Sequence, residues 1–175
     1  VSKKKILGKK KVKKNDLILA IPSSGLHSNG FSLVRHLIKK INLFSKEKNE
    51  LLKPTKIYSS EILKLIKKNY ISACAHITGG GFLENLLRSV PDKFSVKIDL
   101  SKIKVKKIFK WIKSKNISDK EMLKTFNCGV GFCLILPKKN VKKISRFFSK
   151  EYLPYEIGKI TFNSKKINLL NSLKW

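Results

Sequence analysis

The amino-acid sequence predicts an α+β fold, a mixed β-sheet covered by helices in a single domain. The chain has 175 residues and a hydrophobic fraction of 42%, enough for one globular domain with its own core. Short apolar runs alternate with segments whose apolar residues recur every three or four positions. The two kinds of segment do not follow a strict strand–helix–strand order, so we expect a mixed sheet.

The first quarter of the chain predicts a strand, a polar turn and a helix. Residues 16–22 form an apolar run that ends in Pro and Ser, typical of a buried strand. After the turn, apolar residues at helical spacing predict a helix over 30–41. Residues 42–53 are polar and predict a loop or an irregular helix. The lysine run over 9–14 precedes the strand closely, so we expect a solvated strand edge or turn there.

The second quarter predicts one long helix and one strand. Pro54 favours a helix start, and the pattern predicts a helix over 54–69 whose apolar positions include Ile57, Leu63 and Ile66. The run over 70–77 predicts a second strand, which three consecutive glycines interrupt.

The remaining elements follow from the same criteria. Ser118 followed by Glu121 has the spacing of a helix-capping box. The predicted helices of this half are 82–89, 105–114, 118–125 and 141–150, the last with Ile144, Phe147 and Phe148 facing inward. The predicted strands are 94–100, 129–136, 155–162 and 166–170.

The composition limits the functional classes. Forty Lys and Arg residues against eleven acidic ones give a net charge of +29, which is compatible with a nucleic-acid partner. Only three of the forty are Arg (Arg35, Arg88 and Arg146), and lysines are spread along the whole chain. This distribution favours a compositional bias over a phosphate-reading surface. No apolar run is long enough to predict a membrane span.

The N-terminal residues and the cysteines indicate the cellular compartment of the protein. The basic start is followed by no apolar segment of a secretion signal, and the first residue is not Met, so we expect a start inside a longer protein. The three cysteines form no CxxC pair and lie near no ligand-spaced His. We therefore expect free thiols in a reducing compartment, the cytoplasm, with Cys74 and Cys133 in the core.

Three glycine-rich segments carry the functional signal: loop 1 (residues 23–30, SSGLHSNG), loop 2 (78–85, TGGGFLEN) and loop 3 (125–131, TFNCGVG). Each adjoins a predicted strand. Glycines allow a close approach of the backbone to a ligand, and helix N-termini attract anions. Loop 1 adds Ser and Asn hydrogen-bonding groups and His27, which can exchange a proton near neutral pH. Together the loops predict an anion site.

Simpler explanations exist for each feature. A Ser, Gly and Asn turn before a helix can be a helix cap alone. His36 fits a surface position, and His76 fits a core histidine or a residue that orients loop 2. Glu84 fits a helix N-terminus as well as a ligand-facing position. No Lys-Ser or Lys-Thr follows the glycines, which excludes a Walker-type nucleotide loop.

Five segments in order carry a family resemblance: LILAIPSSGLHSNGFSLVR, KPTKIY, AHITGGGFLEN, EMLKTFNCGVG and YEIGKI. They resemble the C-terminal domain of the phosphoribosylformylglycinamidine cyclo-ligases, also called AIR synthetases, and the resemblance spans almost the whole chain. It implies an ATP-dependent ring closure in purine biosynthesis that gives aminoimidazole ribonucleotide, ADP and phosphate. The alternatives are another member of the superfamily, such as a glycinamidine synthase half, and a basic nucleic-acid-binding module.

The resemblance also implies site residues and partners. His27 is the candidate catalytic residue. The implied substrate-binding residues are Ser24, Gly25, Ser28, Asn29, Gly30, Gly79, Gly80, Gly81, Glu84, Asn85, Thr125, Asn127 and Cys128. ATP and Mg²⁺ are implied to bind mainly to an N-terminal domain that this sequence lacks, so no metal ligand is expected in this half. A homodimer is implied for the full-length protein, and this half alone is expected to be inactive.

The sequence departs from the family pattern at three places. Lys124 stands where Arg is usual, which keeps the charge but not the bidentate geometry. Phe132 follows Gly131 where Met is common, and Arg88 lacks a preceding Pro. These departures fit a diverged, lysine-rich member.

Overall fold

One mixed sheet forms the centre of the molecule. The computed structural model describes residues 7–39, 45–162 and 166–175. Its six strands lie in the order β2-β4-β1-β5-β3-β6, with all pairs antiparallel except the parallel pair β3–β6. The strands are β1 (Leu17–Pro22), β2 (Ala73–His76), β3 (Ser95–Asp99), β4 (Val130–Leu136), β5 (Tyr155–Thr161) and β6 (Ile167–Leu170). The predicted mixed sheet is confirmed.

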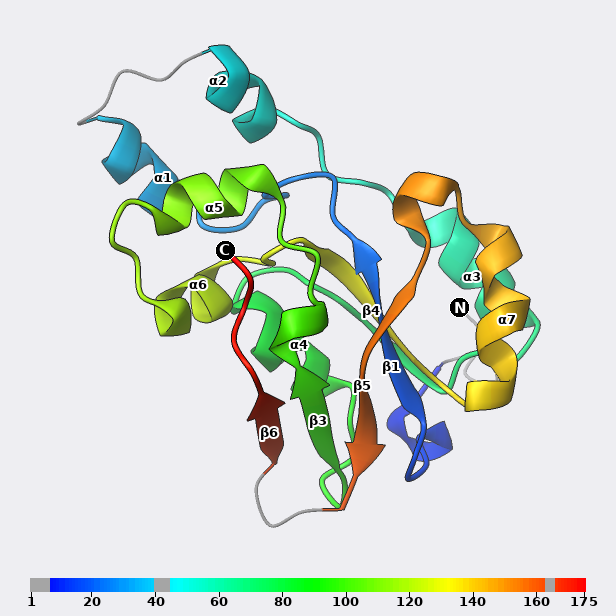
Figure 1. Ribbon diagram of the computed structural model, residues 1–175. Coiled ribbons are helices and arrows are strands. Elements are labelled where there is room, and N and C mark those ends of the chain that lie inside the picture. The colour runs from blue at the N-terminus through cyan, green and yellow to red at the C-terminus, as the bar shows by residue number, and fades with distance from the viewer. Residues whose placement is uncertain (1–6, 40–44, 163–165) are drawn as a thin grey trace.

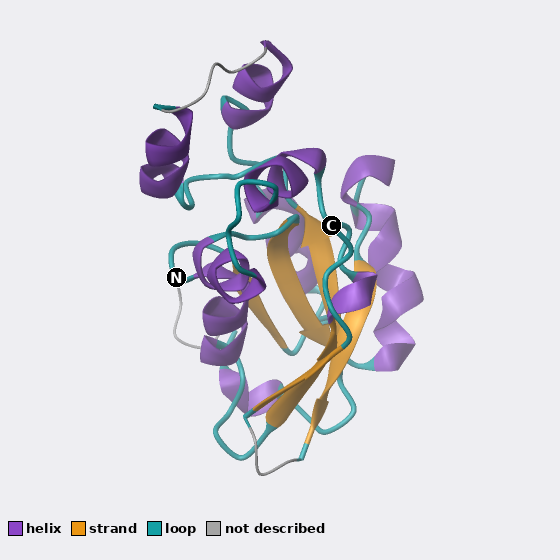
Figure 2. Ribbon diagram, turned by 60° about the vertical axis from the view of Figure 1, so that its left-hand side comes forward, coloured by secondary structure: helices purple, strands orange, loops and turns teal. Residues whose placement is uncertain are grey.

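Helices cover both faces of this sheet (Figures 1 and 2). In the described ranges they are α1 (Phe31–Ile38), α2 (Ser45–Leu51), α3 (Ser59–Lys67), α4 (Gly81–Arg88), α5 (Lys107–Lys113), α6 (Asp119–Thr125) and α7 (Val141–Ile144). Helices α3 and α7 pack on one face, and α4, α5 and α6 pack on the other. Helices α1 and α2 lie beyond one end of the sheet (Figure 1).

The period-two alternation of the central strands produces two apolar clusters. In β1, Ile18 and Ala20 point into the larger cluster, and Leu19 and Ile21 point into the smaller one under α3 and α7. Because both faces are covered by helices, β1 and β4 are buried almost throughout, which explains why they read as continuous apolar runs.

The predicted helix over 54–69 begins five residues later, at Ser59. The preceding residues instead run along loop 1, because the Ser24 hydroxyl donates to the Pro54 carbonyl at 2.7 Å and accepts from the Lys56 amide at 3.2 Å. This start changes the helix phase. The buried positions are Ile62 and Leu65, whereas Ile57 and Leu63, two of the apolar positions of the predicted helix, are exposed.

Other boundaries also differ. A regular helix, α2, occupies most of the segment predicted as a loop or irregular helix, with 42–44 outside the described residues. Helix α1 is described as far as Ile38; the rest of its predicted range, 40–41, also lies outside. The helix predicted over 141–150 is shorter in the structure. The α-helix α7 ends at Ile144, and two 3-10 turns follow, the first of which begins at Ser145. The Lys9–Lys11 segment is an exposed 3-10 turn, as predicted.

The capping box of α6 is confirmed. Ser118 is the N-cap residue, and its hydroxyl accepts a hydrogen bond from the Glu121 amide at 3.2 Å. This bond fixes the start of the helix that leads into loop 3.

Candidate functional site

The sheet topology brings the three glycine-rich loops to one end. Loops 1 and 2 follow the carboxyl ends of β1 and β2, whereas loop 3 leads into the amino end of β4. Strand β4 is antiparallel to both β1 and β2. The three loops therefore meet at the same edge, although they are far apart in the sequence.

Loop 3 is bonded to loop 1. The Asn127 side-chain amide donates to the carbonyls of Gly25 and Leu26, at 3.0 Å each. Its carbonyl oxygen accepts from the Gly129 amide at 2.9 Å, and the Ser23 amide donates to the Gly129 carbonyl at 2.9 Å. Asn127 is fully buried. Its three hydrogen bonds make the two loops one structural unit.

Loop 2 is bonded to loop 1 and packed on α6. The Asn29 side-chain amide donates to the Thr78 carbonyl at 2.8 Å. The Asn85 side-chain amide lies within hydrogen-bond distance of the carbonyls of Thr78, Gly79 and Gly81, at 2.7 to 3.1 Å. Asn29 and Asn85 therefore hold the backbone that a ligand would meet.

Gly81 explains why the second loop needs glycine. Its φ is 71°, in the left-handed region. A Cβ atom there would lie 2.3 Å from the Leu123 carbonyl oxygen and 2.4 Å from that of Lys124. A side chain at this position would push α4 away from the end of α6 and open the loop cluster.

Burial divides the predicted site residues into two groups. The buried group is Gly25, His27, Asn29, Gly81, Asn85, Asn127 and Cys128. The exposed or partly exposed group is Ser24, Ser28, Gly30, Gly79, Gly80, Glu84 and Thr125. Only the second group presents its side chain or backbone at the surface of this chain.

Several members of the exposed group already have partners. Glu84 pairs with Arg88 one turn along α4, and the Thr125 hydroxyl bonds Glu121. The Ser24 hydroxyl holds the 54–56 segment. Ser28 is exposed and is the hydroxyl of loop 1 that is best placed for a ligand.

His27 is a buried, neutral histidine in this structure. Its Nε2 accepts a hydrogen bond from the Ser24 amide at 3.2 Å, which places the proton on Nδ1. Burial, with help from the charges of His76 and Lys106, lowers the pKa of His27 to about 4. Nδ1 is buried and has no hydrogen-bond partner in the described part of the chain. At neutral pH the imidazole is therefore a hydrogen-bonding group rather than a charged acid.

Cys128 is an unreactive thiol in this structure. It is fully buried, and its thiol donates to the Met122 carbonyl at 3.4 Å. Burial raises the pKa of Cys128 to about 12, so the reactive thiolate is not populated near neutral pH. Cys133 is also buried, as predicted, and Cys74 is half-buried. All three thiols are free.

Helices α1 and α4 begin at the loop cluster without a side-chain cap. Gly30 and Gly80 are their N-cap residues and have φ of 72° and 92°. First-turn amides of a helix without a side-chain cap can bind an anion, and the helix dipole favours negative charge there; in α4 the Gly81 amide already donates to the Thr78 carbonyl at 3.2 Å. The cluster thus has the backbone chemistry that a phosphate group requires.

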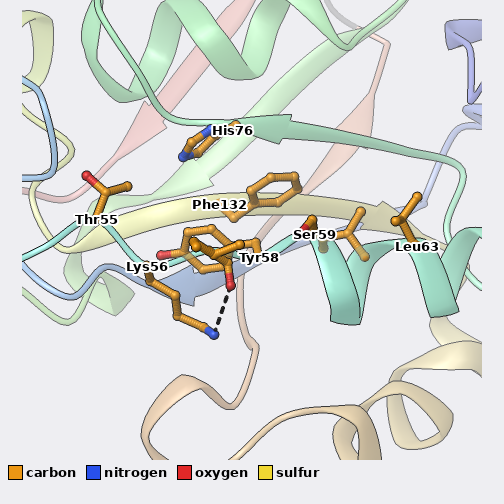
Figure 3. A pocket seen from close by; sticks show the side chains of 9 residues that line it. Thr55, Lys56, Tyr58, Ser59, Leu63, His76 and Phe132 are labelled. Atoms are coloured by element: carbon orange, nitrogen blue, oxygen red, sulfur yellow. Dashed lines mark hydrogen bonds between the residues drawn. The ribbon is translucent and has the colours of Figure 1, made fainter.

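A pocket of about 460 Å³ that the sequence did not predict lies beside the cluster (Figure 3). Its lining residues are Thr55, Lys56, Ile57, Tyr58, Ser59, Ile62, Leu63, His76 and Phe132. Tyr58 connects it to loop 1, because the Tyr58 hydroxyl donates to the Pro22 carbonyl at 2.8 Å. The one signal in the sequence was the KPTKIY segment, which supplies four of these residues.

His76 belongs to this pocket and not to the core. It ends the edge strand β2 and is exposed, so the expectation of a core histidine is wrong. Its ring stacks on that of Phe132 with centroids 5.5 Å apart and also contacts the Tyr58 ring. Partial desolvation of the ring, which packs against Phe132 and Tyr58, lowers the pKa of His76. His36 is exposed on α1, as expected.

The described residues contain no group of three or more His, Cys, Asp or Glu side chains that could hold a metal ion. They also contain no helix long and apolar enough to cross a membrane. Exposed lysines occur on both layers of helices, with Lys64 and Lys142 on one side of the sheet and Lys107 and Lys110 on the other. A nucleic-acid module would instead concentrate them on one face.

The fold is shared with solved structures of a kinase and of a hydrogenase maturation protein. The hydrogenase maturation protein HypE of E. coli has a TM-score of 0.63 over 93% of this chain and 48% of its own, at 14% identity. Thiamine monophosphate kinase of Aquifex aeolicus has a TM-score of 0.61 over 96% of this chain and 54% of its own, at 15% identity. These likenesses define the fold.

The sequence defines the family. Residues 13–167 match the model of the AIR synthase related protein, C-terminal domain, and the chain belongs to this family. The phosphoribosylformylglycinamidine cyclo-ligase of Prochlorococcus marinus (strain AS9601) is 44% identical over 91% of this chain and 50% of its own length. The trifunctional purine biosynthetic protein adenosine-3 of Gallus gallus is 39% identical over 91% of this chain and 18% of its own. The chain thus spans about half the length of the cyclo-ligases it matches.

Proposed function

We propose that this chain is the C-terminal half of a phosphoribosylformylglycinamidine cyclo-ligase. The observation that carries the proposal is the 44% identity to a cyclo-ligase over 91% of the chain. The reaction uses ATP to phosphorylate the amide oxygen of formylglycinamidine ribonucleotide. An internal nitrogen then attacks the activated carbon, and the oxygen leaves as phosphate. The products are aminoimidazole ribonucleotide, ADP and phosphate.

In this proposal the loop cluster is one wall of the substrate site. The uncapped N-termini of α1 and α4 supply amide donors for a phosphate group of the ribonucleotide. Ser28, Gly79, Gly80 and Thr125 provide the exposed contacts. Asn29, Asn85 and Asn127 position the backbone behind them.

His27 has a positioning role in this scheme. Its ring is buried against Tyr58, and its Nε2 holds the Ser24 amide. A neutral imidazole with a depressed pKa is a poor proton donor at neutral pH. We therefore propose that His27 maintains the geometry of loop 1 and does not transfer a proton.

The other half of the enzyme supplies the remaining parts. The donor set described here does not fit Mg²⁺, and we derive no step through that ion. We propose that ATP and Mg²⁺ bind mainly to an N-terminal half, that the complete protein is a cytoplasmic homodimer, and that this half alone is inactive. Two Thermotoga maritima PurL structures of the same fold, at 8–10% identity, contain ADP and AMPPCP.

The test is to complete the enzyme. The chain is joined to the half of the Prochlorococcus marinus cyclo-ligase that it does not match, and ATP-dependent formation of aminoimidazole ribonucleotide is measured. Production of this compound with equal amounts of ADP and phosphate supports the proposal. A joined protein that instead converts formylglycinamide ribonucleotide with glutamine would show a glycinamidine synthase half and contradict it.

A further inference from the structure

An exposed apolar surface borders the pocket of Figure 3. Ile57 and Leu63 are 79% and 64% exposed, and both line the pocket. Its interior is formed by Tyr58, Ile62, His76 and Phe132. We call this surface, Ile57 and Leu63 with the pocket between them, the Ile57–Leu63 surface. Its contiguous apolar side chains are typical of a surface covered by another protein segment.

The surface lies at the end of the edge strand of the sheet, where His76 lines the pocket. Strand β2 is the edge strand and pairs with β4 alone among the described strands. Edge strands are usually covered or protected, because free backbone groups can pair with other chains; here the Ser89 hydroxyl donates to the Cys74 carbonyl of β2 at 2.8 Å. The apolar pocket beside the end of this strand, rather than its backbone edge, therefore indicates an interface.

We propose that the Ile57–Leu63 surface is the docking surface for the N-terminal half of the complete protein. This inference rests on the proposed function, in which the chain is half of an enzyme. The matched cyclo-ligases are twice as long as the matched region. Leu7, which follows the region where that half would be joined, packs on the same apolar cluster as Ile66 of α3. The preceding half would thus be tethered on the side of the sheet that α3 covers.

The net charge of the chain favours the N-terminal half over a second copy of the chain as the partner that covers this surface. The chain has a net charge of +29, Lys56 lines the pocket, and exposed Lys64 adjoins Leu63 on α3. Two copies would bring like charges together, which opposes association. A polypeptide segment without this excess of lysines avoids the repulsion.

The location also suits the chemistry of the proposed enzyme. Tyr58 lines the pocket, and its hydroxyl holds the Pro22 carbonyl at the start of loop 1. The Tyr58 ring also contacts His27. A segment seated on the Ile57–Leu63 surface would therefore border the loop cluster, where the two halves must meet to close the substrate site.

Thiol protection tests this docking. Leu63→Cys is made in a Cys74→Ala background, and its rate of reaction with a maleimide is compared in the isolated chain and in the protein joined to the Prochlorococcus marinus half. We expect joining to slow the reaction at least about tenfold, because the thiol reacts only when the interface opens. The matched control is Phe162→Cys in the same background. Phe162 is 57% exposed and follows β5, so its rate should not change.

The outcomes separate the inference from the function. A joined protein that cyclises the substrate while Leu63→Cys reacts as fast as in the isolated chain overturns the docking surface but keeps the function. Protection without cyclisation keeps the docking surface and counts against the function. Protection of the isolated chain that rises with its concentration indicates a second copy, and protection that needs added ribonucleotide indicates a ligand pocket; either overturns the inference.

Discussion

Asn127 donates a hydrogen bond to the Gly25 carbonyl across 102 positions of sequence, at 3.0 Å. With the bonds to Leu26 and from Gly129, both the nitrogen and the oxygen of this fully buried amide are hydrogen-bonded. A single side chain thus connects two of the three loops that we assign to the substrate site.

Replacing Asn127 with Ala should destabilise the fold. The change leaves the Gly25 carbonyl and the Gly129 amide buried without these partners and leaves the Leu26 carbonyl only the Asn29 amide, and we expect the free energy of unfolding to fall by about 2–4 kcal/mol. Urea denaturation measures it. The control is Asn49→Ala on exposed α2, which should have almost no effect. Equal stability of the two variants would contradict the role of Asn127.

Stability should depend on pH through His27. The pKa of His27 is about 4 in the fold against about 6.5 unfolded, so the unfolded chain binds the extra proton between these values. The contribution of His27 to the free energy of unfolding is therefore fully present above about pH 6.5 and decreases as the pH falls towards 4. Below pH 4 this group causes no further loss, and the total loss is about 3 kcal/mol.

The comparison is urea denaturation of the unmodified chain and His27→Asn at pH 7.5, 5.5 and 4.5. Asn tolerates the left-handed backbone that His27 adopts, with φ of 58°. The unmodified chain should lose more stability than the variant as the pH falls, whereas His36→Asn on exposed α1 should follow the unmodified chain. Parallel curves for all three proteins would show that His27 is not the titrating group.

Gly131→Ala tests the close approach of β4 to the aromatic pocket. A Cβ there would lie 1.9 Å from the Tyr58 hydroxyl and 2.7 Å from His27 Cε1. We expect overpacking to lower the free energy of unfolding by about 1–3 kcal/mol. Gly79→Ala is the matched control, because a Cβ there meets nothing within 4 Å. A thermal melt that ranks the two variants in the opposite order would refute the steric account.

Ser28→Ala separates ligand contact from scaffold. Ser28 is exposed, so the variant should keep its stability, whereas loss of one hydrogen bond to a charged phosphate should raise the KM for the ribonucleotide about tenfold in the joined enzyme. Asn29→Ala should instead lower stability and activity together, because Asn29 holds the Thr78 carbonyl. An unchanged KM for Ser28→Ala would remove Ser28 from the proposed site.

Local patterns in the sequence predicted the elements whose signals are local. The apolar runs of β1 and β4 predicted buried strands, the Ser118–Glu121 spacing predicted the cap of α6, and the glycines of loop 2 predicted a tight turn. Each depends on residues a few positions apart, so propensity and spacing are sufficient. The order of five such segments was also enough to indicate the family.

The tertiary structure alone decided which predicted site residues are exposed and which are buried and hold the loops. The phase of α3 depends on the bonds of Ser24 to Pro54 and Lys56, so the exposure of Ile57 and Leu63 was not visible in the helical pattern. The depressed pKa of His27 likewise depends on burial produced by distant strands. Pairing of segments separated by about a hundred residues is a property of the whole sheet, because no local spacing encodes which loop will lie beside another.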